Sequence, residues 1–295
     1  MKLNRYYFFA LLSYFLWGFF SLALKPIAHE SSLDILFFRI LLSVVIILMI
    51  AVTIKRDTIK IALKRFRNFT IKEKKQALGW NLLGGGLLGF NWFLFIYVVN
   101  QVNVQTASYA YLICPIITSM LSFVLLRENA SWDQLIAMLL CLVGCALYYI
   151  SDPNNLLFAF LIALSYALFL ISQKKNQFFD KFTTLIIQLI TVFILAVPYY
   201  IFKGFHFPTD AAFYLFTGII ALFFTIIPLY MNLYALQGVA ASTVGILIYI
   251  NPIISFLLSV YYFNEPIHWI QILAYILIAI SILVFNIKTL MKVGR

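Results

Sequence analysis

The sequence predicts an all-α integral membrane protein, with ten transmembrane helices arranged as two inverted-topology repeats of five helices. Three observations predict this fold: the composition, a series of apolar stretches and an internal duplication. Of the 295 residues, 64% are hydrophobic and 11% are charged, and the mean hydropathy is +1.00. A soluble domain is about half apolar and about a quarter charged. The composition therefore leaves almost no residues for a soluble domain.

The apolar stretches give the number of spans. A helix that crosses a bilayer needs about 20 predominantly apolar residues. Ten stretches qualify, at residues 6–25, 33–54, 78–100, 104–126, 132–150, 155–173, 182–202, 211–236, 242–263 and 267–287. The first stretch has no small-residue cleavage site, so we expect a span there and not a removed signal peptide.

The basic residues between these stretches set the orientation. With the N-terminus in the cytoplasm, 18 Lys and Arg residues fall in cytoplasmic segments, whereas only Lys25 and Lys203 fall in external ones. This asymmetry follows the positive-inside rule. It predicts a multi-pass protein of the cell inner membrane with both termini cytoplasmic. It also explains the net charge of +11, because the basic residues lie beside the lipid bilayer. We therefore expect the bilayer as a partner and no nucleic acid.

Residues 111–144 and 248–281 are two copies of one segment, at a constant offset of 137 residues. Polar and special residues recur in register, pairing Pro115 with Pro252, Ser122 with Ser259, Glu128 with Glu265, Trp132 with Trp269 and Gln134 with Gln271. Such a register indicates an internal duplication. Because five spans is an odd number, the second copy enters the membrane from the opposite side. We therefore predict one repeat at residues 1–150 and a second, inverted repeat at 151–295, as in many secondary transporters.

Polar and aromatic residues inside the spans are the candidates for a transport site, because lipid offers them no partners. Pro115 and Pro252 are predicted to kink spans 4 and 9 at matching positions, which points to a gate or a substrate site; ordinary packing is the alternative. The residues predicted to contact a small-molecule substrate are Trp17, Asn91, Trp92, Tyr111, Tyr230 and Asn251. For Asn91, a hydrogen bond between helices is the alternative interpretation.

The charged residues in and near the spans have different expected roles. Arg39 lies within a span, and its guanidinium could hold a carboxylate or phosphate of the substrate. The alternative is that it snorkels outward or pairs with helix carbonyls. Glu128 and Glu265 are expected to cap the helices that they precede. We expect no Asp or Glu inside a span, and hence no obvious proton carrier.

Two further patterns concern packing and the membrane surface. Gly85 and Gly89 form a GxxxG pair, which lets a neighbouring helix approach closely. The segment 55–77 alternates nine basic residues with apolar ones. It could form an amphipathic helix on the anionic inner leaflet, but a solvated basic loop that fixes topology is favoured.

Sequence patterns typical of enzymes are missing. The chain contains no GxxxxGK[ST], HExxH or GxSxG motif. Its three cysteines lie in apolar stretches, and its three histidines lie in loops far from them. We therefore expect no enzymatic activity, no catalytic residue, no cofactor, no metal site and no disulfide framework.

Several motifs together resemble a known family. They are residues 14–18, Phe38-Arg39, residues 89–92 with Phe95 and Asn100, and the segment from Pro115 to Glu128 with its copy. On these the chain is similar to the EamA-type transporters of the drug/metabolite transporter superfamily, in their RarD-like branch. The resemblance implies ten helices, two inverted EamA repeats, and efflux or exchange of small metabolites such as amino acids. Arg127 and Asn264 replace the glycine that the family often has before the repeated glutamate.

The sequence thus predicts a secondary transporter that works by alternating access. Spans 4 and 9, with spans 1, 3, 6 and 8, would line its central cavity. The alternative is a non-transporting polytopic membrane protein, such as a sensor or an assembly factor. A homodimer is compatible with the sequence.

Overall fold

The computed structural model describes residues 5–126, 131–151, 153–203, 207–235, 237 and 248–293. Within these ranges every regular element is a helix. In the first half of the chain they are α1 (Arg5–Gly18), α2 (Phe20–Leu24), the 3₁₀ turn η1 (Lys25–Ile27), α3 (Ser32–Thr53), α4 (Arg56–Asn68), α5 (Ile71–Gln101), α6 (Val104–Leu126) and α7 (Trp132–Ser151). In the second half they are α8 (Pro153–Lys175), α9 (Lys181–Lys203), α10 (Ala211–Ala221), the π-helical turn η2 (Leu222–Ile226), α11 (Ile227–Ala235), α13 (Ile250–Tyr261) and α14 (Trp269–Val293).

This architecture confirms an all-α polytopic membrane protein. In the part of the chain that the structure describes, six helices are long and apolar enough to cross a membrane, and the bent pair of α1 with α2 and η1 makes a seventh. Three shorter apolar helices lie at Leu135–Tyr148, Ile250–Tyr261 and Trp269–Ser281. A helix thus occupies each of the ten predicted stretches, and the number of complete crossings stays a prediction.

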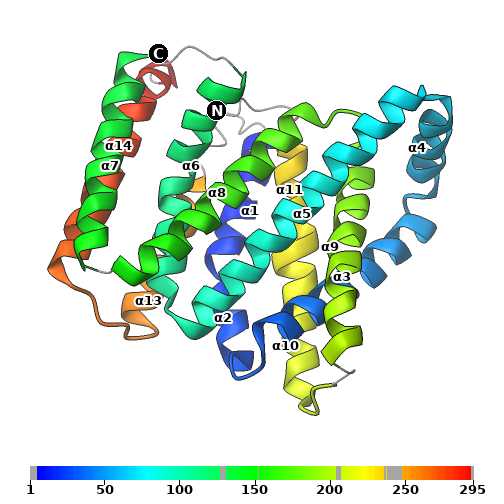
Figure 1. The fold of residues 1–295 in the computed structure, drawn as a ribbon, viewed down its shortest axis with the longest axis horizontal. Coiled ribbons are helices and arrows are strands. Elements are labelled where there is room, and N and C mark those ends of the chain that lie inside the picture. The colour runs from blue at the N-terminus through cyan, green and yellow to red at the C-terminus, as the bar shows by residue number, and fades with distance from the viewer. Residues whose placement is uncertain are drawn as a thin grey trace.

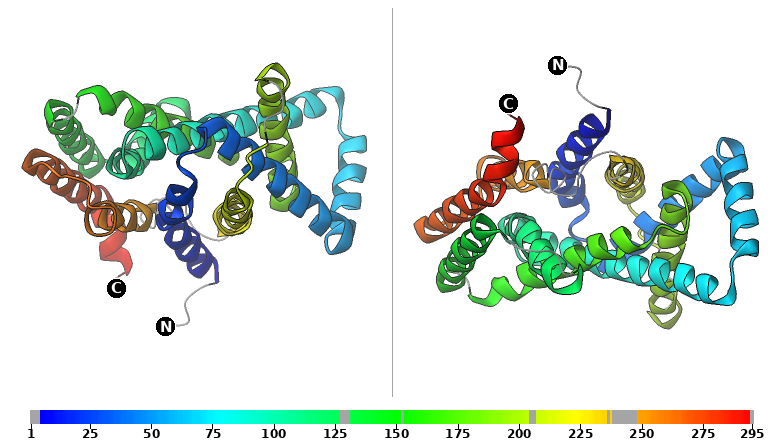
Figure 2. Two further views of the ribbon diagram at one scale, coloured as in Figure 1. Left: turned by 90° about the horizontal axis from the view of Figure 1, so that it is seen from below. Right: turned by 90° about the horizontal axis from the view of Figure 1, so that it is seen from above.

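The helices form an elongated bundle (Figure 1). Helices α7 and α14 lie side by side at one end, and α4 lies at the opposite end, as both views in Figure 2 also show. Between these ends, α1 packs between α11 and α13, and α6 packs on α8 and α13. The centre of the bundle is therefore built by helices from both halves of the chain.

Glycines bring the long helices close together. A methyl group added at Gly85 of α5 would lie 2.7 Å from Thr191 Cβ of α9, and one added at Gly89 would lie 3.0 Å from Val192 Cγ1. These distances confirm the close approach that the GxxxG pair predicts. At Gly144 of α7, an added methyl group would lie 2.6 Å from Ile278 Cγ1 of α14.

Two spans are irregular near the centre of the bundle. The first span bends by 42° between α1 and α2. A methyl group added at Gly18, the last residue of α1, would lie 2.7 Å from Ile254 Cβ of α13. The other irregular span contains η2, where the Ile227 N–H bonds the Leu222 carbonyl five residues earlier. π-Helical turns of this kind are frequent at functional sites.

The two repeated prolines occupy different positions in their helices. Pro115 lies in the interior of α6, and its carbonyl accepts a hydrogen bond from Ser119 Oγ at 2.9 Å. Pro252 is the third residue of α13, in the first helical turn, where a backbone N–H has no acceptor within the helix. Its carbonyl accepts a hydrogen bond from Ser108 Oγ of α6 at 2.8 Å. Helices α6 and α13 therefore contact each other at this point.

The segment 55–77 differs from the favoured expectation of a solvated loop. Residues Arg56–Asn68 form α4, and Thr70 with Glu73 forms a capping box at the start of α5. The apolar side of α4 packs Ala62 and Phe66 into a cluster with Phe179. The expected loop is wrong because apolar residues recur at helical spacing, and this side of the helix is buried against the loop between α8 and α9.

Glu265 is a helix cap, but for a helix other than the one expected. Its carboxylate accepts the backbone N–H groups of Val104 at 2.9 Å and Gln105 at 3.1 Å, which begin α6. Lys25 Nζ lies 4.0 Å from the same carboxylate. The contact joins segments far apart in the chain, which local spacing could not reveal. Its predicted counterpart Glu128 lies outside the described residues.

Candidate functional site

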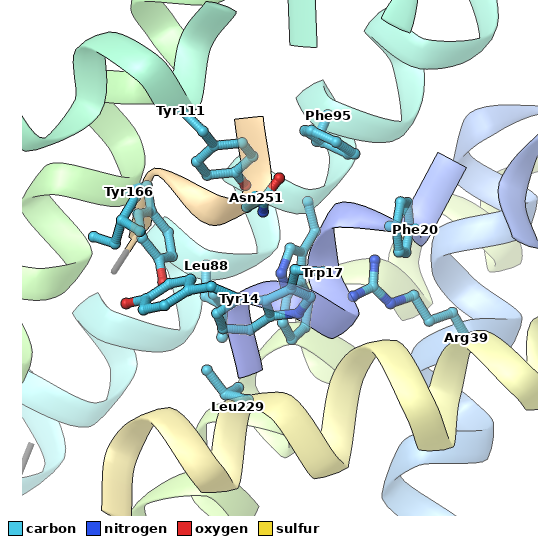
Figure 3. A pocket seen from close by; sticks show the side chains of 12 residues that line it. Tyr14, Trp17, Phe20, Arg39, Leu88, Phe95, Tyr111, Tyr166, Leu229 and Asn251 are labelled. Carbon is cyan, nitrogen blue, oxygen red and sulfur yellow. The ribbon is translucent and has the colours of Figure 1, made fainter. Parts of the chain in front are cut away.

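A pocket lies where the central helices of both halves meet (Figure 3). Its lining residues come from α1, α2, α3, α5, α6, α8, α11 and α13, with one residue that precedes α13. They are Tyr14, Trp17, Phe20, Arg39, Leu88, Trp92, Phe95, Tyr111, Tyr166, Leu229, Ile248 and Asn251. The cavity volume is about 40 Å³, enough for a few water molecules. The pocket is thus aromatic and small, and it carries one positive charge.

Arg39 is the charged residue of this pocket, and it is only 2% exposed. Its Nε donates to Thr225 Oγ1 at 2.7 Å, and its Nη2 donates to the Phe224 carbonyl at 3.3 Å. The guanidinium lies over two aromatic rings, 4.5 Å from the centroid of Trp92 and 5.0 Å from that of Phe20. Cation–π contacts of this kind stabilise a desolvated cation by about 2 kcal/mol. Arg39 therefore pairs with neutral groups and points into the pocket without snorkelling outward.

Trp17 joins the same cluster from the bent first span. Its indole Nε1 donates to the Phe224 carbonyl at 3.0 Å, so two pocket side chains share this acceptor. Pro228, four residues later, has no N–H to offer this carbonyl. A helix irregularity in the second half thus supplies an acceptor to side chains from the first half.

Asn91 is completely buried and reaches the pocket through Tyr111. Its Nδ2 donates to the Ile162 carbonyl at 2.8 Å and to Ser165 Oγ at 3.1 Å, both on α8. Its Oδ1 accepts a hydrogen bond from the Tyr111 hydroxyl at 3.0 Å. The helix-to-helix bond of the alternative interpretation is therefore present, and Asn91 is not itself among the lining residues.

Of the other residues predicted to contact the substrate, some line the pocket and one does not. Trp17, Trp92, Tyr111 and Asn251 line the pocket. Tyr230 is absent from that lining and packs its ring edge-on against Phe182, with centroids 6.1 Å apart.

Sequence reasoning did not select several lining residues. These are Tyr14, Phe20, Leu88, Phe95, Tyr166, Leu229 and Ile248. Helical spacing in the sequence could have identified part of this set, because Leu88, Trp92 and Phe95 recur on one face of α5. The Tyr14 hydroxyl accepts from Asn232 Nδ2, and the buried Tyr166 hydroxyl lies beside the Tyr14 hydroxyl.

The expectation of no acid inside a span is wrong. Helix α3 begins at Ser32, so Asp34 lies in its first turn, where it is 3% exposed. Its Oδ1 accepts a hydrogen bond from the Tyr200 hydroxyl at 2.7 Å. The ring of Tyr200 stacks on Phe37 with centroids 3.8 Å apart. Asp34 lies outside the pocket lining.

In the described ranges, no group of three or more His, Cys, Asp or Glu side chains is placed to hold a metal ion. The pocket lining itself contains only aromatic and aliphatic residues, one arginine and one asparagine. This set of groups can bind a small molecule through ring contacts and hydrogen bonds.

Comparison with known proteins identifies the family of this chain. The model of the EamA-like transporter family matches residues 4–150 and again 154–287. The chain belongs to the EamA-like transporter family. It is accordingly a multi-pass membrane transporter, and its family implies a small-molecule substrate.

Relatives of this transporter confirm the RarD-like assignment. The uncharacterized transporter YojE of Bacillus subtilis is 26% identical over 86% of this chain and 84% of its own length. Protein RarD of Escherichia coli is 26% identical over 87% of this chain and 85% of its own. A solved crystal structure shares the fold, with a TM-score of 0.66 and 13% identity, over 96% of this chain and 97% of the other.

Proposed function

We propose that this chain is a secondary transporter that exports or exchanges a small metabolite with an anionic group, an amino acid or a related compound. Transport proceeds by alternating access between residues 1–150 and residues 151–295. The observation that carries this proposal is the buried guanidinium of Arg39, which faces an aromatic pocket whose described lining residues include no carboxylate.

The charge of Arg39 sets the chemistry of the substrate. A charged side chain inside the membrane is costly and is retained where it has a function. The guanidinium has five N–H donors, and the described residues provide acceptors for two of them. A carboxylate can accept two parallel N–H bonds from one guanidinium. Arg39 is therefore the anchor for an anionic group.

The opposite end of the pocket offers hydrogen bonds of another kind. In Figure 3, Tyr14 and Tyr166 lie on the side away from Arg39, with the Trp17 ring between. The Tyr166 hydroxyl is buried beside that of Tyr14, so a polar group of the substrate can bond this pair of hydroxyls. The aromatic rings would enclose the body of the molecule. A compound with an acid at one end and a polar group at the other matches this arrangement.

The remaining predicted residues receive roles from their positions. Trp17, Trp92, Tyr111 and Asn251 contact the substrate, and Asn91 holds Tyr111 in place. Tyr230 contacts substrate only in a conformation where α11 has moved. Pro115 and Pro252 act as gating positions in α6 and α13, which contact each other.

The small cavity supports a moving mechanism. Substrate pockets commonly measure about 300–1,000 Å³, far above the cavity found here. Entry of a metabolite therefore requires the central helices to separate. In the proposed orientation in the inner membrane, with both termini cytoplasmic, the two halves rock against each other to open the pocket to either side.

A flux measurement tests this proposal. The purified protein is reconstituted into liposomes, and uptake of radiolabelled L-amino acids and 2-oxo acids is measured with and without a pH gradient. We expect saturable uptake of at least one carboxylate-bearing compound. The absence of saturable flux for the whole panel would favour a sensor or an assembly factor.

A further inference from the structure

One backbone carbonyl in the pocket joins the two halves of the chain. The Phe224 carbonyl of η2 accepts from Trp17 Nε1 at 3.0 Å and from Arg39 Nη2 at 3.3 Å. The next residue, Thr225, accepts from Arg39 Nε at 2.7 Å and donates to the Ile220 carbonyl at 3.0 Å. Both donors come from residues 1–150 and both acceptors from residues 151–295. Neither Phe224 nor Thr225 lines the pocket.

Local chain chemistry makes these acceptors available. Pro228 cannot donate to the Phe224 carbonyl, and the π-helical turn shifts the backbone bonds by one residue. Thr225 is completely buried, so its hydroxyl has no access to water. Figure 3 shows Arg39 extending beside the yellow span formed by α10, η2 and α11. The irregular turn is thus shaped to receive the guanidinium.

The acceptors are weak partners for a buried cation. A carboxylate brings a full negative charge and can accept two parallel N–H bonds from one guanidinium, which a single hydroxyl or carbonyl cannot do. A neutral hydroxyl and a carbonyl therefore satisfy Arg39 less well than a carboxylate would. Any anion that enters the pocket competes with Thr225 and Phe224 for the same guanidinium.

We propose that η2 is a displaceable counter-site for Arg39. In the empty pocket η2 holds α1 and α3 against α10–α11, and an anionic substrate that enters replaces η2 as the acceptor for the guanidinium. This inference rests on the proposed anchoring of an anion by Arg39. Loss of the bonds to Thr225 and Phe224 loosens the contact between the two halves. Substrate binding is thereby coupled to the movement that opens the pocket. Thr225 and Pro228 are positioning residues in this device.

The direction of the change in anion affinity distinguishes a displaceable counter-site from a purely structural role for η2. Thr225→Val removes the acceptor and keeps the shape, so the empty pocket loses a competing bond. Anion affinity should then rise by about two- to tenfold, the range for one hydrogen bond. Pro228→Ala supplies an N–H that can occupy the Phe224 carbonyl, and it should act in the same direction. Thr225→Ser keeps the hydroxyl and should restore the affinity of the unaltered protein.

The experiment measures binding without depending on transport. Acetate, benzoate and inorganic phosphate are titrated into detergent-purified protein, and tryptophan fluorescence reports binding near Trp17 and Trp92. Thr217→Val is the matched control, because Thr217 is also buried and donates to the Phe213 carbonyl at 2.7 Å within its own helix. Circular dichroism and the unfolding temperature verify that each variant is folded.

The outcomes distinguish the two proposals. Tighter anion binding in folded Thr225→Val, with rescue by serine and no change in Thr217→Val, supports the counter-site. Weaker or unchanged binding in Thr225→Val overturns it, as does a failure of all three anions to bind in an Arg39-dependent way. If the binding results hold but no compound is transported, the proposed transport function fails while the counter-site stands.

Discussion

The pocket around Arg39 and a second cavity, lined by α6, α7 and α8, differ in size and in chemistry. The second cavity has a volume of about 400 Å³, against about 40 Å³ for the pocket. It is lined by Ile113, Ile116, Ile117, Met120, Met138, Cys141, Leu142, Cys145, Leu156, Leu157 and Phe160. Several of these side chains are exposed on the outer surface, Leu157 by 62% and Leu142 by 54%.

This difference shows that cavity volume is a poor guide to the transport site in this fold. The larger cavity offers no charge and no oxygen or nitrogen atom of a side chain, so it suits the hydrocarbon chains of lipid. The smaller pocket gathers an arginine, an asparagine and three tyrosines from both halves of the chain. A polar metabolite needs those groups to replace its lost hydration. Substitutions in the two places should therefore have different consequences.

The largest effect is expected at Arg39. Arg39→Ala removes the proposed anchor, and loss of hydrogen bonds to a charged group should reduce uptake efficiency by about 30-fold or more. Arg39→Lys keeps the charge but loses the planar fork, so it should retain part of the activity. Uptake of a carboxylate-bearing substrate into liposomes, normalised to folded protein, gives the measurement. Full uptake by folded Arg39→Ala would remove the pocket from the transport path.

A smaller effect is expected at Asn91. Asn91→Leu removes the bond to the Tyr111 hydroxyl and the two bonds to α8. The Tyr111 ring would lose its fixed orientation, so KM should rise by about fivefold, equivalent to one hydrogen bond of roughly 1 kcal/mol. Tyr111→Phe deletes the same bond from the other side and should give a similar KM. A rise in one variant alone would show that Asn91 and Tyr111 act separately.

These expectations also show what the sequence could predict. Composition and loop charges are sums over many residues, so the all-α membrane fold follows from them. The sequence also points to Trp17, Arg39, Trp92 and Tyr111, because polar and aromatic groups are conspicuous inside apolar helices. It does not point to Tyr14 and Tyr166, since the chain has 18 tyrosines and spacing alone does not separate pocket residues from lipid-facing ones.

Other features depend on contacts between distant segments. Pro228 is visible in the sequence, but its effect requires Trp17 and Arg39 to meet the freed carbonyl across about 200 residues of chain. Glu265 likewise caps α6 and not the helix that follows it. Asp34 stands inside the predicted stretch 33–54, but its buried contact with the Tyr200 hydroxyl joins residues 166 positions apart, which local spacing cannot reveal.

Around the larger cavity, substitutions should act on packing. Gly144 of α7 lies against α14, and Gly144→Ala would place its methyl group 2.6 Å from Ile278 Cγ1. Such overpacking should destabilise the protein by about 1–3 kcal/mol, seen as a lower unfolding temperature, with unchanged KM. Gly86→Ala is the matched control, because the nearest atom to its methyl group is Leu195 Cδ1 at 4.0 Å. Equal unfolding temperatures for the two variants would contradict the close packing of α7 and α14.

The smallest effect is expected inside that cavity. Leu157→Phe adds apolar volume to a wall that already faces lipid, so neither the charge nor the hydrogen bonds of the pocket change. Uptake kinetics should stay within about twofold of the unaltered protein, because surface substitutions away from special features are nearly neutral. The same liposome assay used for Arg39→Ala provides the comparison. A larger change in KM would mean that substrate passes through the apolar cavity, and the distinction between the two cavities would then have to be abandoned.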